Sequence, residues 1–178
     1  MQDTEKLTIF RIRKRQRIMD YKKYDIQEAK AAIMRYCAYQ ERSQAEVKDK
    51  LESMGLIPLV VDMIMVELIE GNFVNELRFA EEFARGKFRQ KGWGKIKIRE
   101  KLRQRKVSDQ CISLALESLD EDEYRQQMER LAEWKMLQLS DKEKNPFVRK
   151  QKVIGFLFSR GFEYDLLRDV VDSLSGDR

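Results

Sequence analysis

The stretch from Arg85 to Lys106 carries the densest charge in the chain and defines its candidate chemistry. Eleven of its residues are basic and only Glu100 is acidic, a net charge of +10 in a chain whose total is +5. Lysine and arginine at this density can bind the phosphates of a polyanion. The same residues are good helix formers and often occupy solvated helical faces. The charge therefore indicates either a polyanion contact or an ordinary solvated surface.

Groups suited to catalysis are scarce. The chain has no histidine, which removes the commonest general base and the usual zinc ligand. It contains no Walker A or G-x-G-x-x-G stretch. Cys37 and Cys111 lack disulfide-framework or metal-ligand spacing and are expected to be reduced. The acidic run at 119–124 coincides with an expected helix start, where carboxylates are favoured. The sequence predicts a protein that is not an enzyme and holds no metal or cofactor.

Helical geometry gathers the basic residues into rows. On the helix expected after Asn75, three arginines lie within about 40° of one another at 100° per residue. The following helix has two cationic rows on either side of a thin apolar seam. The arginines are Arg78, Arg85 and Arg89; the rows are Lys97, Lys101 and Arg105, and Arg99, Arg103 and Lys106; the seam is Ile98 and Leu102. We expect no i,i+4 carboxylate to relieve this charge, which favours the polyanion contact.

Trp93 stands between Gly92 and Gly94, where the chain is expected to bend between the two basic helices. One interpretation makes it a core anchor between helices, and the other makes it a stacking ring beside a phosphate. The residues alone leave both open. Lysine and arginine position a protein on a nucleic acid more than they read its sequence. The stretch therefore does not predict a sequence-specific reader.

Three ungapped stretches, starting at Val47, Ile98 and Val153, share one apolar pattern. Their offsets of 51 and 55 residues indicate tandem repeats. Seven columns are apolar in every copy: Val47/Ile98/Val153, Leu51/Leu102/Leu157, Leu56/Val107/Phe162, Val60/Cys111/Leu166, Val61/Ile112/Leu167, Met65/Leu116/Val171 and Leu68/Leu119/Leu174. The spacing predicts two amphipathic helices joined by a tight turn. Gly55, Lys106 and Gly161 share the turn position, which favours a residue that tolerates positive φ.

One further helix is expected before each copy. The first runs from Ile26 to about Arg42 with Tyr39 near its apolar face, the second is capped by Asn75, and the third starts at Asp120 with Trp134 and Leu137 on its apolar face. The chain is therefore predicted to be all-α, with three tandem three-helix repeats at 26–70, 73–119 and 120–175. Repeats of this kind form elongated, curved bodies. Residues 1–25 are expected to form a basic arm with a strand-like stretch at 7–13.

No membrane segment is expected. The most apolar run, 56–69, is interrupted by Pro58, Asp62 and Glu67 and is shorter than the roughly 20 residues of a span. The N-terminus has no long apolar core of a secretory signal. We expect a cytoplasmic protein that acts as a monomer.

The chain resembles the RecX family, whose members regulate the RecA recombinase. The resemblance rests on "RYCAYQERSQAEVKDKLESMGL" (35–56), "NELRFAEEFARGKFRQKGWGKIKIREKLRQRKV" (75–107) and "KQKVIGFLFSRGFEYDLL" (150–167). The middle motif is the most specific. The chain departs from it at Lys106, where a turn glycine is typical, and the 1–25 arm has no clear counterpart.

The resemblance implies three tandem three-helix repeats and a protein that binds the RecA–DNA filament. Such a protein suppresses the filament's ATPase and strand exchange or promotes its disassembly, with weak, nonspecific binding to single- or double-stranded DNA. The middle-repeat residues that match the basic motif are the candidates for these contacts: Arg78, Arg85, Lys87, Arg89, Lys91, Trp93, Lys95, Lys97, Arg99 and Arg103. Lys101 and Arg105 join them from the cationic rows. The alternative is a nonspecific DNA-binding architectural or transcription factor that acts without RecA.

Overall fold

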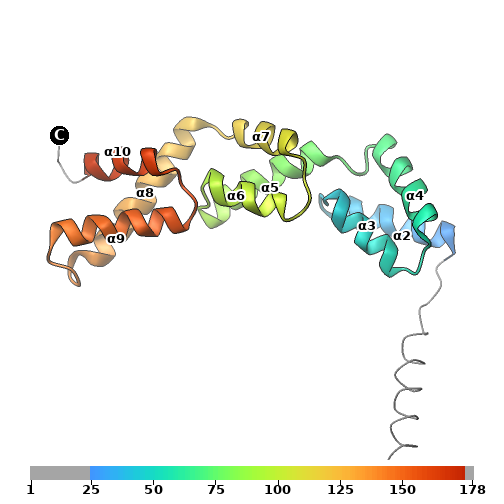
Figure 1. Cartoon of the computed structure of the whole chain (residues 1–178), viewed down its shortest axis with the longest axis horizontal. Helices are drawn as coiled ribbons and strands as arrows, with labels where there is room; N and C mark the ends of the chain where they lie inside the picture. The colour runs from blue at the N-terminus through green and yellow to red at the C-terminus, as the bar shows by residue number, and fades with distance from the viewer. Residues whose placement is uncertain (1–24, 175–178) are drawn as a thin grey trace, which may run out of the picture. The chain divides into compact units, whose positions relative to one another are not determined.

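The computed structural model describes residues 25–174, and within that range the chain forms nine helices and no strand (Figure 1). The helices are α2 (Ile26–Tyr39), α3 (Gln44–Ser53), α4 (Pro58–Glu70), α5 (Glu76–Lys91), α6 (Lys95–Arg103), α7 (Asp109–Glu117), α8 (Glu121–Ser140), α9 (Pro146–Ser159) and α10 (Tyr164–Leu174). The all-α prediction of three three-helix repeats is confirmed. The elongated, curved shape stays a prediction. Of the predicted arm at 1–25, residues 1–24, which include its strand-like stretch, lie outside the described residues.

The chain divides into two compact units, Met1–Val74 and Asn75–Arg178. The first unit contains α2 to α4 around a core of its own. The second contains α5 to α10, and one continuous core extends from Phe79 to Val171 through both of its repeats. The second and third repeats therefore form one packed body.

The repeat columns explain these cores. The columns that begin at Val47, Leu51, Val61 and Met65 are buried in all three repeats, as the pattern predicts. The column that begins at Val60 differs, because Val60 and Cys111 are half-buried and Leu166 is exposed. This column lies at the edge of the helical interface, where an apolar side chain is only partly covered.

The first helix ends earlier than expected. Its last residue is Tyr39, whose side chain is 84% exposed, so the predictions of a helix to Arg42 and of Tyr39 near its apolar face are wrong. The chain is extended at Gln40, and Ser43 then starts α3 with a capping box. In that box the Ser43 hydroxyl accepts from the Glu46 backbone, and the Glu46 carboxylate accepts from the Ser43 backbone. This new N-terminus needs non-helical residues before it.

The inward face of α8 also differs from the prediction. Tyr124 and Met128 are buried, but Trp134 is 48% exposed and Leu137 is 74% exposed. The buried row continues through Ala132 instead, four residues after Met128. Steps of four residues keep a row on one helical face, whereas the predicted steps of three turn it outward. The placement of Trp134 and Leu137 in the core was therefore wrong.

The turns inside the repeats have the predicted backbone. Gly55, Lys106 and Gly161 adopt φ values of 80°, 58° and 86°. After Lys106 the Val107 amide donates to Leu102 O at 3.2 Å, and after Gly161 the Phe162 amide donates to Leu157 O at 3.4 Å. Lys106 thus completes the same turn as glycine, although its Cβ strains the left-handed conformation.

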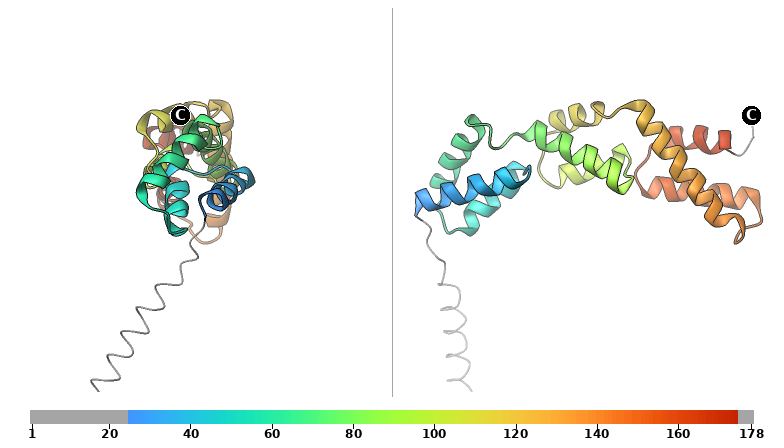
Figure 2. Two further views of the ribbon diagram at one scale, coloured as in Figure 1. Left: turned by 90° about the vertical axis from the view of Figure 1, so that its right-hand side faces the viewer. Right: turned by 180° about the vertical axis from the view of Figure 1, so that it is seen from behind.

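Two glycines join the second repeat to the third. The Gly94 amide donates to Arg160 O at 2.9 Å, and the Ile96 amide donates to Gly161 O at 3.0 Å. A Cβ on Gly94 would lie 2.2 Å from Gly161 O, and a Cβ on Gly161 would lie 2.4 Å from the Cβ of Lys97. We call these contacts the glycine junction. It places the turn between α9 and α10 beside the start of α6 (Figures 1 and 2).

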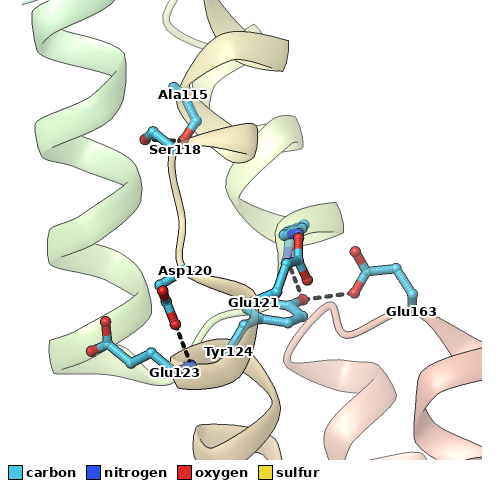
Figure 3. A network of polar contacts seen from close by, with 8 residues as sticks. Ala115, Ser118, Asp120, Glu121, Glu123, Tyr124 and Glu163 are labelled. Carbon is cyan, nitrogen blue, oxygen red and sulfur yellow. Dashed lines mark hydrogen bonds and ion pairs between the residues drawn. The ribbon is translucent and has the colours of Figure 1, made fainter.

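Tyr124 of α8 contacts both sides of the same junction. Its ring lies 5.5 Å from the Phe88 ring and 5.3 Å from the Phe162 ring. Its hydroxyl accepts from the Lys95 amide at 2.9 Å and donates to Glu163 at 2.6 Å (Figure 3). Burial raises the pKa of the Tyr124 hydroxyl, and the hydrogen bond to Glu163 raises it further. The hydroxyl is therefore a neutral structural link between α6, α8 and the turn before α10.

The glycine junction predicts a large effect for Gly94→Ala. Its methyl group would meet backbone atoms that cannot rotate away, so we expect the unfolding free energy of the second unit to fall by about 2–4 kcal/mol. Urea unfolding followed by tryptophan emission measures this, because Trp93 and Trp134 both belong to that unit. Gly86→Ala is the control. Gly86 lies inside α5 with open space around it, so alanine should stabilise by about 0.5–1 kcal/mol. If Gly94→Ala and Gly86→Ala changed the free energy of unfolding equally, the close backbone contact at the glycine junction would be contradicted.

Lys106→Gly should stabilise the second unit. Glycine relieves the left-handed strain of about 1–2 kcal/mol. It also makes the unfolded chain more flexible, which offsets part of this gain. We therefore expect the free energy of unfolding in urea to rise by about 0.5–1 kcal/mol. Gln104→Gly provides the control, because Gln104 has a right-handed φ of −60° and glycine should destabilise there. A loss of stability in Lys106→Gly would show that the turn is not strained.

Candidate functional site

The arginine row of α5 is largely neutralised by carboxylates. Arg85 lies 3.9 Å from Glu81 and 3.6 Å from Glu82, one turn earlier on the same helix. Arg89 donates two hydrogen bonds of 3.0 Å to Glu123 of α8. The hydrogen bonds to this carboxylate also raise the pKa of Arg89. The prediction that no i,i+4 carboxylate relieves the basic stretch is therefore wrong for Arg85, because Glu81 lies four residues before it. Glu123 of α8 relieves Arg89 as well.

Two cations of α6 are neutralised in the same way. Lys95 forms an ion pair with Glu121, and Arg103 forms one with Asp109 at 2.8 Å. The acidic run at 119–124 caps α8 as predicted, since the Asp120 carboxylate accepts from the Glu123 amide at 2.7 Å (Figure 3). Sequence reasoning missed its second role, which is to supply Glu121 and Glu123 as partners for Lys95 and Arg89.

The other side of α6 has a different environment. It faces the rings of Phe83 and Trp93, and the Nζ of Lys97 lies 5.2 Å from the Trp93 centroid. The Nζ of Lys87 lies 5.2 Å from the Phe83 centroid and 5.8 Å from that of Trp93. The guanidinium of Arg105 lies 4.6 Å from the Phe83 centroid. These distances fall within the range of cation–π attraction. We call this group the ring–cation cluster and include Lys101, whose backbone oxygen accepts from the Arg105 guanidinium at 3.1 Å.

The lysines of the ring–cation cluster keep their charge available. Among residues 25–174, neither Lys87, Lys97 nor Lys101 forms an ion pair with a carboxylate. Lys97 donates to Ser159 O at 3.1 Å, and Lys101 donates to the amide oxygen of Gln104 at 2.9 Å. The two rows predicted on α6 therefore differ, because Lys97 and Arg105 of one row lie beside rings, whereas Arg103 of the other row pairs with Asp109.

The remaining candidates are not drawn into this cluster by any described contact. Within the described part of the chain, Lys91 and Arg99 are exposed and form no ion pair. Arg78 donates its backbone amide to the Asn75 cap at 2.9 Å. The structure thus brings Lys87, Trp93, Lys97, Lys101 and Arg105 together.

Trp93 combines features of both interpretations. Its ring is half-buried and packs against the core of the second unit, as a helix anchor does. The ammonium groups of Lys87 and Lys97 lie near the same ring. The anchoring is therefore present, and contact with a ligand stays a prediction.

Two residues of this region were missed by sequence reasoning. Phe83 was not among the predicted site residues, yet its half-buried ring lies beside the cations of Lys87 and Arg105. Arg160 of the third repeat donates to Lys91 O at 2.6 Å, across 69 positions of sequence. Its only sequence signal is its place before the turn glycine Gly161, and only the fold brings it to the basic stretch.

In the part of the chain that the structure describes, no group of three or more cysteine, aspartate or glutamate side chains is placed to hold a metal ion. No described helix has the length and apolar character to cross a membrane.

Comparison with known proteins agrees with the three-repeat fold. Sequence models of the first, second and third three-helix domains of RecX match residues 29–68, 75–116 and 121–171. Regulatory protein RecX of Mycobacterium sp. (strain JLS) is 30% identical over 155 residues, which cover 85% of each chain. Regulatory protein RecX of Streptococcus uberis is 29% identical over 143 residues; the match covers 79% of this chain and about half, 53%, of that protein.

Two solved structures share the fold. The crystal structure of RecX from Lactobacillus salivarius has a TM-score of 0.77 at 24% identity and covers 84% of this chain and 96% of that one. A second crystal structure of regulatory protein RecX has a TM-score of 0.70 at 20% identity, with 86% and 74% covered. The three matched domains and the mycobacterial relative show that the chain belongs to the RecX family of regulatory proteins.

Proposed function

We propose that the protein binds the RecA–DNA filament and inhibits or remodels it through its basic middle repeat. The observation that carries this proposal is the ring–cation cluster, where Lys87 and Lys97 keep their charge beside Phe83 and Trp93 and Lys101 keeps its charge one helical turn after Lys97. A filament on DNA offers both phosphates and acidic protein surface along its groove. Cations that are not neutralised by the protein's own carboxylates are available for both.

The mechanism requires binding and no chemical step. A body with one cationic repeat contacts neighbouring RecA subunits in the groove and hinders the rotations that ATP hydrolysis drives. ATPase activity and strand exchange then fall, or subunits leave the filament. The protein acts as a monomer in the cytoplasm, where its partner assembles on DNA. Contact with naked DNA is weak and nonspecific, because lysine and arginine position without reading bases.

Charge reversal of the cluster tests the proposal. We expect Lys87→Glu, Lys97→Glu and Lys101→Glu together to raise the concentration that half-inhibits RecA ATPase by more than about tenfold, since each reversal replaces attraction by repulsion. The measurement is a titration of preformed filaments that hydrolyse ATP.

The matched control reverses Lys50, Lys142 and Lys144, which are exposed and lie in the first and third repeats. It changes the net charge by the same amount and should leave inhibition near that of the wild type. Unchanged inhibition by the cluster variant would rule out the middle repeat as the binding surface.

Salt separates this function from that of an architectural factor that acts without RecA. If about five cations meet phosphates, log K for naked DNA should fall against log salt with a slope of roughly −3.5 to −4.5. At salt that abolishes this binding, the protein should still slow ATP hydrolysis by preformed filaments, because protein contacts persist. Parallel loss of both activities would favour the architectural factor.

A further inference from the structure

A second group of rings and cations lies on the third repeat. The rings of Trp134 on α8 and Phe156 on α9 lie 5.7 Å apart at 39°. The Nζ of Lys135 lies 5.3 Å from the Phe156 centroid, and the guanidinium of Arg160 lies 4.7 Å from it. Trp134 is 48% exposed. A large ring in this position leaves a flat apolar surface open to a ligand.

This group adjoins the ring–cation cluster through the glycine junction. Arg160, which lies over Phe156, donates to Lys91 O at 2.6 Å, two residues before Trp93. Lys97, which lies near Trp93, donates to Ser159 O at 3.1 Å, one residue before Arg160. Rings and cations therefore follow one another from Trp93 to Trp134 within the second unit. We call this surface the aromatic strip.

The cations of the aromatic strip are not neutralised by the chain. Within residues 25–174, neither Lys97, Lys135 nor Arg160 forms an ion pair with a carboxylate. Nearby Arg89 and Lys95 behave differently, because both are paired with acidic residues of α8. Half-buried positive charge without a carboxylate partner thus coincides with rings, a combination that suits a ligand with both negative charge and flat apolar faces.

Single-stranded nucleic acid has this chemistry. Its phosphates complement the cations, and an unpaired base can stack on an aromatic ring. In a duplex each base is already stacked between its neighbours, so a duplex offers the strip mainly its phosphates. We propose that the aromatic strip binds single-stranded nucleic acid, with an unpaired base stacked on Trp134. This inference rests on the proposed function and deepens it by naming the strand state that the protein contacts.

Tryptophan emission reports the stacking directly. The chain has two tryptophans, so a full-length Trp93→Phe variant leaves Trp134 as the only one. Saturating oligo(dT) should quench its emission, and a duplex of equal length should quench it less. Fluorescence anisotropy of labelled DNA confirms saturation in the same samples. Unchanged Trp134 emission at saturation would overturn the inference, because binding would then involve charge alone.

A second measurement uses the opposite substitution. Base stacking contributes enough that Trp134→Leu should weaken oligo(dT) binding at least about fivefold and duplex binding less than twofold. Leu137→Ala is the matched control, since Leu137 lies on the same helix, is 74% exposed and has no ring. Its affinity for oligo(dT) should equal that of the wild type. If Trp134→Leu and the wild type bound oligo(dT) with equal affinity, stacking of a base on Trp134 would be contradicted.

RecA ATPase inhibition by the same variants separates the two proposals. If Trp134→Leu binds oligo(dT) normally but loses inhibition, Trp134 contacts protein and the strip inference fails while the proposed function stands. If Trp134→Leu loses strand binding and the charge reversal of the cluster leaves inhibition intact, the strip stands and the proposed function fails.

Discussion

The close approach of two backbone turns determines how the second unit is built. At the glycine junction, peptide groups of the α5–α6 turn bond directly to those of the α9–α10 turn, with no side chain between them. Any residue with a Cβ at Gly94 would place that atom inside the contact distance of the Gly161 carbonyl. This proximity brings Lys97 to Ser159 and Arg160 to Lys91. The surface that spans the second and third repeats exists because of it.

Electrostatic pairing then decides which cations face a ligand. The N-terminus of α8 concentrates carboxylates that favour the helix dipole, and two of them also pair with Arg89 and Lys95. Exposed pairs of this kind add little stability. Their effect is on the distribution of charge, since they neutralise Arg89 and Lys95 and leave Lys87 and Lys97 charged beside Phe83 and Trp93. Pairing thus confines the charge that is available to a ligand to one part of the surface.

The local pattern of apolar, capping and turn residues predicted much of the fold. The apolar columns, the caps at Asn75 and Asp120, and the left-handed turn at Lys106 all follow from residue spacing and backbone preference. The outward positions of Tyr39 and Trp134 did not follow. Tyr39 depends on where the capping box of α3 starts, and Trp134 on which of two apolar rows on α8 meets α9. The carboxylate partners of Arg89 and Lys95 come from α8, so a pattern within the basic stretch could not reveal them. Glu81 and Glu82 lie on the same helix as Arg85, just before the stretch.

The division of the cores also bears on how the protein loses its structure. Repeat proteins are often described as chains of similar modules that interact with their nearest neighbours. Here the second and third modules share one continuous core, and the first has its own. Cooperativity follows the shared core, so α5 to α10 form a single thermodynamic block. Although its sequence repeats three times, the protein should melt as two blocks.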